Sequence, residues 1–386
     1  MEKMPEIYWI DLNKFDTKND KSTWLEMSEI LIKNGFKVTL LCGYKYNKEK
    51  YPSYKIRIKY LSAISFSPIY RLILLLRATF YLLQEAGPKD LIIVSPASLF
   101  AGYILKFFKK CHIHLDIRSP AIEVHGFKNH IIKLLFWTFP LYFFSNSPNT
   151  YSFISRQLKY QVETGFNTKF KNHLIWHSGV NTRMFQNIMT QKKQDPSKFN
   201  LLYQGSLSPN RGIDLIIKSL ALLKKSVKEN IMLSIVGGGP YLNIFKKMAS
   251  ELNMAEHIQF AGFIPYEKMP LIIQAADCCI CPLPDLPEWN VSSPLKVFEY
   301  LACGKPMILT PIAAHKQIIT NNDFIIWTKG FSPADFSTAI EMACCNQHIL
   351  AESAKKFGIN NAQYYDWELQ GNKFAVYLKS EVQKKI

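Results

Sequence analysis

The segment Pro287–Pro311, with the sequence PEWNVSSPLKVFEYLACGKPMILTP, carries the most informative signals in the chain. A loop over residues 287–293 leads into a helix that starts near Pro294. Gly304 ends this helix, and the short apolar run Met307–Leu309 indicates a strand. The order of loop, helix and strand predicts a helix whose N-terminus faces a site for an anion.

The first turn of this helix is suited to phosphate. Proline fits the first helical position because no amide hydrogen is needed there, and Ser292 or Ser293 can cap the remaining amides. Free amides and the helix dipole attract anions, so a bound anion would explain a cation, Lys296, at this end. Glu299 lies one turn further on, where a carboxylate can accept hydrogen bonds from two sugar hydroxyls. This pattern favours a nucleotide-sugar pocket, and the alternative is an ordinary amphipathic helix with an exposed Lys/Glu pair.

The length of 386 residues exceeds one typical hydrophobic core and indicates two domains. A hydrophobic content of 48% with 20% charged residues is typical of a globular protein without extensive disorder. The net charge of +17 is uneven, because residues 1–195 carry 28 Lys and Arg against 14 Asp and Glu, whereas residues 196–386 carry 19 against 16. The first half therefore carries most of the basic surface.

Two apolar and basic segments lie in the first half, Ile69–Leu83 and Phe127–Phe144. Together with the excess of lysine and arginine, they favour contact with an anionic membrane surface over nucleic acid. The alternative is a solvated, lysine-rich surface. The most apolar run, Leu134–Phe144, is too short to cross a bilayer and is interrupted by Pro140, so we expect a soluble or monotopic protein.

The eight cysteines lie mostly within apolar runs and lack the paired spacing of a zinc site. They are expected to be reduced core residues of a cytosolic protein. We therefore expect no metal site and a cytoplasmic location, with at most peripheral contact at the inner face of the cell membrane.

The first half alternates apolar strands with helices, which predicts a parallel sheet in a doubly wound domain. Strands are expected at 7–12, 37–42, 57–61, 91–95, 111–117 and 143–146, and helices at 24–33, 69–84, 98–108 and about 150–158. Ligands of such sheets bind at the carboxyl ends of strands. Those ends carry Ser95, Asp116, Arg118 and Glu123. Asp116 and Arg118 either form a structural salt bridge or take part in catalysis.

The second half restarts the strand–helix pattern after a polar stretch near residues 186–198, where we place the domain boundary. Strands are expected at 200–204, 232–236, 258–260, 278–281 and 307–309, and helices at 213–225, 241–252, 266–275, 335–344, 352–361 and 368–384. Two strand–helix turns, Gly205–Gly212 and Gly237–Gly239, are rich in glycine. Glycine lets backbone amides approach a phosphate closely, although glycine at a strand end is more often part of a tight turn.

Several segments of the second half follow the order found in one enzyme family. They are YQGSL at 203–207, RGID at 211–214, VGGGP at 236–240, FAGFI at 260–264, AADCCICP at 275–282 and SPLKVFEYLACGKPMI at 293–308. This series resembles the retaining GT-B glycosyltransferases of family 4, also called group 1 glycosyltransferases. WHSGVNTRMF at 176–185 is similar to the family's interdomain segment. The resemblance covers Leu174 to the C-terminus, and the first half matches in architecture only.

The resemblance implies an α/β fold of the GT-B type, with two facing Rossmann-like domains, parallel sheets and a cleft between them. Residues 1–186 would form the acceptor-binding domain, and residues 187–365 would bind the nucleotide-diphosphate sugar. Residues 366–386 would form a C-terminal helix that packs back on the first domain. No bound cofactor and no metal are implied, because in this family cations of the protein stabilise the departing diphosphate.

Matching residue by residue gives a set of implied site residues. The donor-binding residues are Gly205, Ser206, Arg211, Gly237, Phe263, Ile264, Ser293, Pro294, Leu295, Lys296 and Glu299. The catalytic candidates are Asp116, Arg118, Arg211 and Lys296. Within the donor-binding set, Arg211 and Lys296 would neutralise the diphosphate and Glu299 would hold the ribose. Phe263 or Ile264 would lie beside the base.

The chain departs from the family pattern at four places. Val291 stands where the family commonly has a glutamate eight positions before Glu299, and Ser206 stands where a basic residue often follows the first glycine. The first strand–helix turn of the chain lacks the family's glycine-rich loop, and Asp116 replaces a histidine after a sheet strand. The first departure bears on the choice of sugar, and the last two bear on the acceptor.

The leading hypothesis is an enzyme of polysaccharide biosynthesis. It would transfer a sugar, with retention, from a nucleotide-diphosphate donor to a hydroxyl of a cell-surface glycan or its lipid carrier. The expected partners are a nucleotide sugar, a glycan or lipid-linked acceptor and an anionic membrane, but not nucleic acid. Two alternatives stand beside it, a catalytically silent GT-B subunit that binds a partner or membrane, and a GT-B sugar-nucleotide epimerase.

Overall fold

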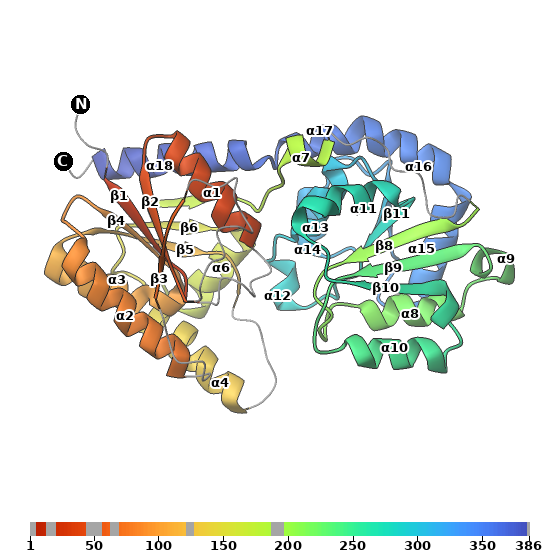
Figure 1. Cartoon of the computed structure of the whole chain (residues 1–386), viewed down its shortest axis with the longest axis horizontal. Coiled ribbons are helices and arrows are strands. Elements are labelled where there is room, and N and C mark those ends of the chain that lie inside the picture. Colours follow the sequence, from red (N-terminus) through yellow and green to blue (C-terminus); the bar gives the residue numbers. More distant parts are fainter. Residues whose placement is uncertain are drawn as a thin grey trace. The chain divides into compact units, whose positions relative to one another are not determined.

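A computed structural model describes residues 5–12, 21–43, 56–61, 69–120, 127–186 and 197–383 of the chain. Contacts divide the chain into a first unit, Met1–Ser178 with Trp367–Ile386, and a second unit, Gly179–Asp366. Each unit consists of one parallel sheet with helices packed on it (Figure 1). The prediction of an α/β fold with two Rossmann-like domains is therefore confirmed.

In the described residues of the first unit, seven parallel strands form one sheet in the order β3-β2-β1-β4-β5-β6-β7. The strands are β1 Glu6–Ile10, β2 Lys37–Cys42, β3 Arg57–Tyr60, β4 Leu91–Val94, β5 His112–Ile117, β6 Thr150–Phe153 and β7 His173–Ile175. The helices are α1 Lys21–Lys33, α2 Ile69–Glu85, α3 Leu99–Lys109, α4 Phe127–Lys133, α5 Phe139–Phe144, α6 Arg156–Gly165 and α18 Trp367–Gln383, with a π-helical turn at Leu134–Thr138.

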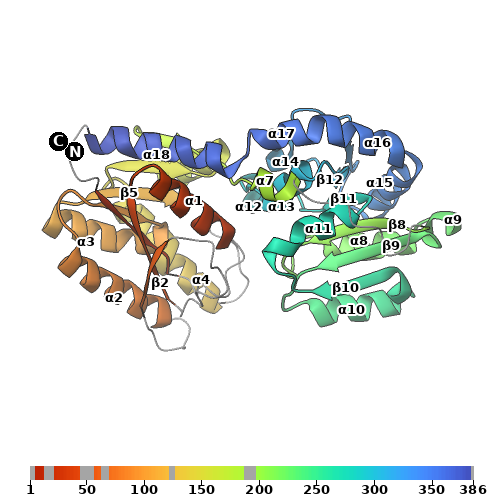
Figure 2. The ribbon, with the colours of Figure 1, turned by 45° about the horizontal axis from the view of Figure 1, so that its top comes forward.

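Helices α1 and α18 cover one face of this sheet, and α2 and α3 lie on the other face (Figure 2). Trp9 of β1 packs against Trp24 of α1 and Phe374 of α18, with ring centroids 4.9 and 6.3 Å apart. Phe374 also stacks on Trp176, with 5.0 Å between the ring centroids. The C-terminal helix is therefore part of the first unit's core.

Two elements predicted around residues 143–158 are wrong. The expected strand at 143–146 is the end of helix α5, whose Phe144 packs on Phe100 and Tyr103 of α3 with ring centroids 5.5 and 4.9 Å apart. The helix expected around 150–158 begins only at Arg156, as α6, and residues 150–153 form strand β6 instead. Asn149 starts that strand by bonding with the backbone of Ile113 on β5. The aromatic run thus forms a helix packed on another helix, and the polar run pairs with β5.

In the described residues of the second unit, six parallel strands form a sheet in the order β10-β9-β8-β11-β12-β13. The strands are β8 Phe199–Gln204, β9 Ile231–Val236, β10 Ile258–Gly262, β11 Cys278–Cys281, β12 Met307–Leu309 and β13 Ile325–Trp327. The helices are α7 Thr182–Gln186, α8 Ile213–Ala221, α9 Lys225–Lys228, α10 Leu242–Glu251, α11 Met269–Ala275, α12 Pro287–Asn290, α13 Leu295–Ala302, α14 Ala313–Ile318, α15 Pro333–Cys345, α16 Gln347–Ser353 and α17 Ile359–Gln363. The sequence did not indicate α12, α14 or β13.

The division between the units falls earlier than the predicted boundary after residue 186. Helix α7 packs in the second unit, where the Phe185 side chain is fully buried. The Phe185 carbonyl accepts a hydrogen bond from the Cys303 thiol at 3.5 Å. The Val180 amide donates to the Tyr365 carbonyl at 2.9 Å, which ties the start of this unit to its end. Residues 187–196 of the predicted linker lie outside the described residues.

The prediction that the cysteines are core residues is confirmed for the six that are buried, and none of the eight, all of which lie in the part of the chain that the structure describes, forms a disulfide. Strand β11, with the sequence CCIC, is buried at every position. No helix among the described residues is long and apolar enough to cross a membrane. Within the same residues, no group of three His, Cys, Asp or Glu side chains could hold a metal ion.

Candidate functional site

Two glycine turns of the second unit lie side by side at the carboxyl ends of the neighbouring strands β8 and β9. The Gly205 amide donates to the Val236 carbonyl at 2.9 Å, and the Leu207 amide donates to the Gly238 carbonyl at 3.0 Å. Gly205 and Gly237 have φ angles of 143° and 138°. A Cβ atom on Gly237 would lie 1.9 Å from the Gly205 carbonyl oxygen, so this close approach of two backbones requires glycine.

Lys296 projects from α13 into the space beside these turns. Its side chain is buried, and Nζ lies 4.1 Å from the centroid of the Tyr203 ring. A Cβ atom on Gly205 would lie 2.9 Å from the same nitrogen. Among the described residues, Nζ has no hydrogen-bond acceptor. Burying an ammonium group without a counterion is costly, so this position suits a bound anion.

Lys296 lies beside one of the departures from the family pattern. Ser206 stands where a basic residue was expected after the first glycine, and Lys296 brings an ammonium group to the neighbouring Gly205 from a different element. The cation at this turn is therefore supplied by α13.

The start of α13 differs by one residue from the prediction. The helix begins at Leu295, and Pro294 is the N-cap with φ −70° and ψ 108°, without a side-chain cap hydrogen bond. The Ser292 hydroxyl instead donates to the Trp289 carbonyl at 2.7 Å. Ser293 is half-buried in the same loop. The first amides of an α-helix have no partner within the helix, so the amides of Leu295 and Lys296 begin α13 next to the buried ammonium group.

Glu299 lies one turn beyond Lys296 and pairs with Gln204 at the end of β8. The Gln204 side-chain amide donates to a carboxylate oxygen of Glu299, and both side chains are buried. Burial raises the pKa of Glu299 to about 7, and the hydrogen bond from Gln204 and the charge of Lys296 oppose this rise. Sequence reasoning missed Gln204. A polar residue at the end of an otherwise apolar strand was the available signal.

Arg211 is positioned by α12, which occupies residues expected to form a loop. The guanidinium carbon lies 4.9 Å from the centroid of the Trp289 ring, and Nε donates to the Ser208 hydroxyl at 3.0 Å. Trp289 Nε1 donates to the Asn210 carbonyl at 2.7 Å, so the indole also holds the turn. Sequence reasoning did not identify Trp289, because its contacts are with a turn far away in the chain.

Arg211 and Lys296 both act on the end of strand β11. Burial raises the pKa of the Cys281 thiol, and the charges of Lys296 and Arg211 oppose that rise. A Cβ atom on Gly212 would lie 2.0 Å from the Pro282 carbonyl oxygen, which brings the Arg211 turn against the residue after this strand. The two predicted diphosphate-binding cations therefore lie around the same strand end.

The predicted base-binding residues follow strand β10. Phe263 is 76% exposed, and Ile264 packs against the second unit's core. The Gly237 amide donates to the Gly262 carbonyl at 2.8 Å, so this segment adjoins the second glycine turn. An exposed ring beside the glycine turns is available to a planar base.

Asp116 and Arg118 lie in the first unit, at the carboxyl end of β5. Asp116 Oδ1 accepts a hydrogen bond from the Ser152 hydroxyl at 2.6 Å. The Arg118 guanidinium donates to the Trp176 carbonyl at 2.8 Å and stacks 3.4 Å from the centroid of the indole. The first strand–helix turn and Glu123 lie outside the described residues.

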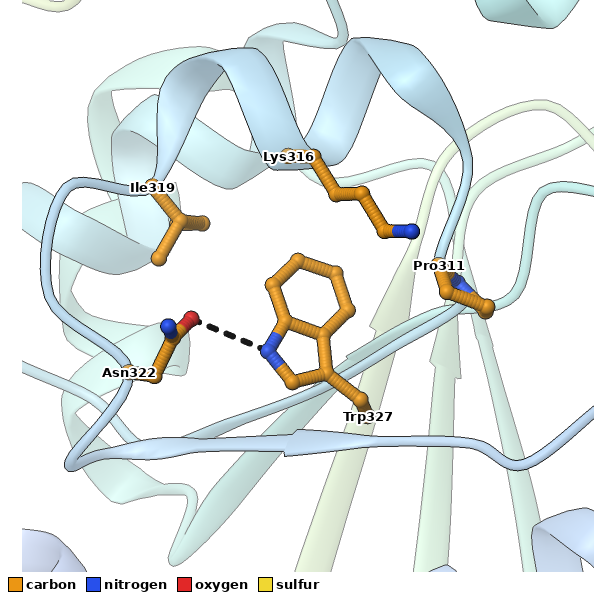
Figure 3. A pocket seen from close by; sticks show the side chains of 5 residues that line it. All are labelled: Pro311, Lys316, Ile319, Asn322 and Trp327. Atoms are coloured by element: carbon orange, nitrogen blue, oxygen red, sulfur yellow. Dashed lines mark hydrogen bonds between the residues drawn. The ribbon is translucent and has the colours of Figure 1, made fainter.

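The second unit also holds a pocket of about 390 Å³ that contains none of the predicted site residues (Figure 3). It is lined by Pro311, Lys316, Ile319, Asn322 and Trp327. Trp327 Nε1 donates to Asn322 Oδ1 at 3.0 Å, which orients the indole.

Comparison with known proteins connects this site to an activity. Residues 184–364 match the family model described as "Glycosyl transferases group 1". An uncharacterized glycosyltransferase of Methanocaldococcus jannaschii is 27% identical over 271 residues, which cover 68% of this chain and 67% of that protein. These matches support a glycosyltransferase.

Other relatives match over shorter segments. A GDP-mannose-dependent alpha-(1-6)-phosphatidylinositol monomannoside mannosyltransferase of Mycolicibacterium smegmatis is 36% identical over 104 residues, covering 26% of this chain and 27% of that protein. The match thus covers only 27% of the length of this relative.

Solved structures establish the fold of the glycosyltransferase as GT-B. Anabaena HepE, in complex with UDP and glucose, aligns with a TM-score of 0.74 at 14% identity and covers 97% of this chain and 100% of that chain. Sucrose-phosphate synthase from Thermosynechococcus elongatus aligns with a TM-score of 0.76 at 14% identity, covering 97% and 98%.

The close approach of the glycine turns predicts a position-specific effect of alanine in this glycosyltransferase. We expect Gly237→Ala to lower the free energy of unfolding by about 2 kcal/mol or more, because a Cβ would clash with the Gly205 carbonyl at an unfavourable φ. Gly238→Ala is the control, since no atom lies within 4 Å of its Cβ. Urea unfolding followed by circular dichroism measures both variants, and equal losses would contradict the packing described.

The raised pKa of Glu299 predicts a pH-dependent stability. The folded state holds the proton up to about pH 7, whereas the unfolded chain releases it near the ordinary value of 4.5. The free energy of unfolding should therefore fall as pH rises from about 4.5 to 7, by up to about 3 kcal/mol. Glu299→Gln should remove this part of the pH dependence and be the more stable protein at pH 8. Parallel slopes for the two proteins in urea titrations across this range would show that Glu299 ionises normally.

Proposed function

We propose that the protein is a retaining family 4 glycosyltransferase. It transfers a sugar from a nucleotide-diphosphate donor to a hydroxyl of a cell-surface glycan or its lipid carrier, as in polysaccharide biosynthesis. The observation that carries this proposal is the buried Lys296 ammonium, which has no acceptor among the described residues and lies beside two glycine turns. A diphosphate supplies the missing negative charge.

The donor roles follow from the geometry of the second unit. Lys296 and the first amides of α13 bind the diphosphate, and Arg211, held by Trp289, adds a second cation. Glu299, oriented by Gln204, accepts hydrogen bonds from the ribose hydroxyls. Solved relatives with UDP or UDP-glucose bound support a nucleotide donor, and the mannosyltransferase relative is GDP-mannose-dependent.

The reaction breaks the bond between the anomeric carbon and the diphosphate oxygen and forms a bond to the acceptor oxygen. The hydroxyl proton passes to the departing diphosphate, whose charge the two cations stabilise in the transition state. This chemistry uses side chains of the protein and no bound metal. The first unit, with Asp116 and Arg118 at the carboxyl end of β5, contacts the acceptor or the transferred sugar.

Removing the ammonium group tests the donor site. Lys296→Ala should weaken binding of a nucleoside diphosphate and lower the transfer rate by about a hundredfold, because one charge-assisted contact contributes about 1.5–3 kcal/mol. Lys316→Ala, an exposed lysine of α14, is the matched control. Calorimetry with UDP and GDP measures binding, and release of nucleotide from a panel of nucleotide sugars measures turnover.

The outcomes also separate the alternatives. If no nucleoside diphosphate binds the wild-type protein, the glycosyltransferase hypothesis is wrong, and the result favours a catalytically silent GT-B subunit. If nucleotide is released without a glycosylated acceptor, the activity is that of an epimerase. Unchanged turnover in Lys296→Ala would remove the role given to this residue.

A lipid-linked acceptor fits the exposed surface of the first unit. Ile69, Leu72, Leu76 and Phe80 recur at helical spacing along one side of α2 and are 50–65% exposed. Helices α3 and α5 pack beside one another and add exposed aromatic side chains. These side chains are Phe100, Tyr103, Phe107, Phe108, Phe139, Tyr142 and Phe143. Exposed apolar surface of this extent marks an interaction site.

We propose that this surface, the α2–α3–α5 surface, rests on the anionic inner face of the cell membrane. The first half of the chain carries the excess positive charge, and exposed basic side chains lie in the middle of α2, at Arg77, and directly after α3, at Lys110. Apolar insertion with basic attraction is the arrangement of a monotopic protein.

Vesicle flotation tests the membrane contact. We expect the wild-type protein to float with vesicles containing phosphatidylglycerol, and to float less with vesicles of phosphatidylcholine alone, because basic side chains prefer an anionic surface. The double variant Leu76→Glu/Phe80→Glu should remain unbound, whereas Leu222→Glu, an exposed leucine after α8, should bind as the wild type does. Unchanged flotation of the double variant would place the contact elsewhere, and dimerisation lost in that variant would point to a second copy.

A further inference from the structure

A continuous row of buried polar side chains joins strands β5 and β6 in the first unit. The His112 ring contacts the Thr150 hydroxyl at 3.0 Å, and that hydroxyl contacts His114 Nδ1 at 3.0 Å. His114 Nε2 contacts the Ser152 hydroxyl at 2.7 Å, and Ser152 donates to Asp116 at 2.6 Å. The strand register places Thr150 opposite His114 and Ser152 opposite Asp116, which makes the row continuous. All five side chains are at most 5% exposed.

With Asp116 as the carboxylate acceptor of the Ser152 hydroxyl, the number of available protons fixes the direction of the other hydrogen bonds. A hydroxyl has one proton, and Ser152 gives its proton to Asp116, so His114 Nε2 must donate to Ser152. Burial holds the pKa of His114 well below its ordinary value, so the ring is neutral and carries one N–H. Nδ1 of His114 must then accept from Thr150, and His112 Nε2 must donate to Thr150 in turn.

We propose that this row is a one-directional hydrogen-bond chain that holds Asp116 ionised and oriented for contact with a substrate hydroxyl. The chain runs from His112 through Thr150, His114 and Ser152 to the carboxylate. Each donor polarises the next, and the low dielectric of the buried sheet strengthens the effect. His114, Thr150 and Ser152 are positioning residues in this account, because they act through Asp116.

The opposite direction is the only other arrangement of the chain, and it requires a protonated Asp116. The carboxylic acid would donate to Ser152, Ser152 would donate to His114 Nε2, and His114 would carry its proton on Nδ1. The tautomer of His114 therefore reports the charge of Asp116.

The position of the chain connects it with the acceptor role proposed for the first unit. Asp116 lies at the carboxyl end of β5, the edge at which parallel sheets bind ligands. Phe374 and Tyr377 of α18 cover His114, with ring centroids 5.3 and 6.1 Å from the imidazole. The C-terminal helix thereby keeps the chain away from water. The assignment of Asp116 to a substrate hydroxyl rests on the proposed function, whereas the direction of the chain does not.

The direction is tested in the unmodified protein. A two-bond ¹H–¹⁵N correlation spectrum of the full chain, labelled at histidine and assigned with His114→Gln, distinguishes the two tautomers. We expect the proton on Nε2 and an unprotonated Nδ1 throughout pH 6–8. A proton on Nδ1 would reverse the chain and overturn the proposal, whether or not any transfer activity is found.

The positioning role is tested by kinetics with the full chain. Ser152→Ala should lower kcat/KM for the acceptor about tenfold or more through loss of one charge-assisted hydrogen bond, with KM for the nucleotide sugar unchanged. Ser152→Thr retains a hydroxyl and should restore activity. Full activity of Ser152→Ala, or no rescue by threonine in a folded variant, would overturn the role. UDP and GDP affinity in the same variants reports separately on the donor site, so failure of the proposed function is distinguished from failure of this inference.

Discussion

The buried ammonium group of Lys296 is the constraint around which the second unit's site is arranged. Desolvation of a cation costs several kcal/mol unless an anion or an acceptor compensates for it. In the structure, Nζ lies 4.1 Å from the centroid of the Tyr203 ring and has no hydrogen-bond acceptor among the described residues, although its charge interacts with the Glu299 carboxyl one turn away. A bound diphosphate would offset the free-energy cost of burying this ammonium group.

The glycine turns are needed for the same reason. A Cβ atom on Gly205 would lie 2.9 Å from the Lys296 ammonium nitrogen, and a Cβ atom on Gly237 would lie 1.9 Å from the Gly205 carbonyl oxygen. Trp289 and Gln204 then limit the freedom of the charged groups, since one holds the Arg211 turn and the other holds the Glu299 carboxylate. The pocket charges are therefore pre-organised by neutral side chains, which reduces the cost of ordering them on binding.

The sequence predicted those parts of the fold that depend on local pattern. Strands β2, β11 and β12 were placed with their observed bounds, because each is a short apolar run between turn or charged residues. Strand β6 was missed because its polar residues make sense only opposite the histidines of β5, and α5 was read as a strand because its aromatic residues face another helix. Lys296 and Glu299 were predicted as site residues from their spacing in the sequence. Gln204 and Trp289 were not, because their importance comes from contacts between distant segments of the chain.

The two units provide opposite electrostatic environments at the ends of their strands. In the second unit, a cation lacks an acceptor, and this suits a leaving group that arrives with negative charge. In the first unit, an ordered series of donors ends on a carboxylate, and this suits a neutral hydroxyl that needs an acceptor. Sugar transfer has both requirements, because the donor leaves as an anion and the nucleophile enters with a proton. The division of charge between the units therefore matches the division of labour expected for donor and acceptor.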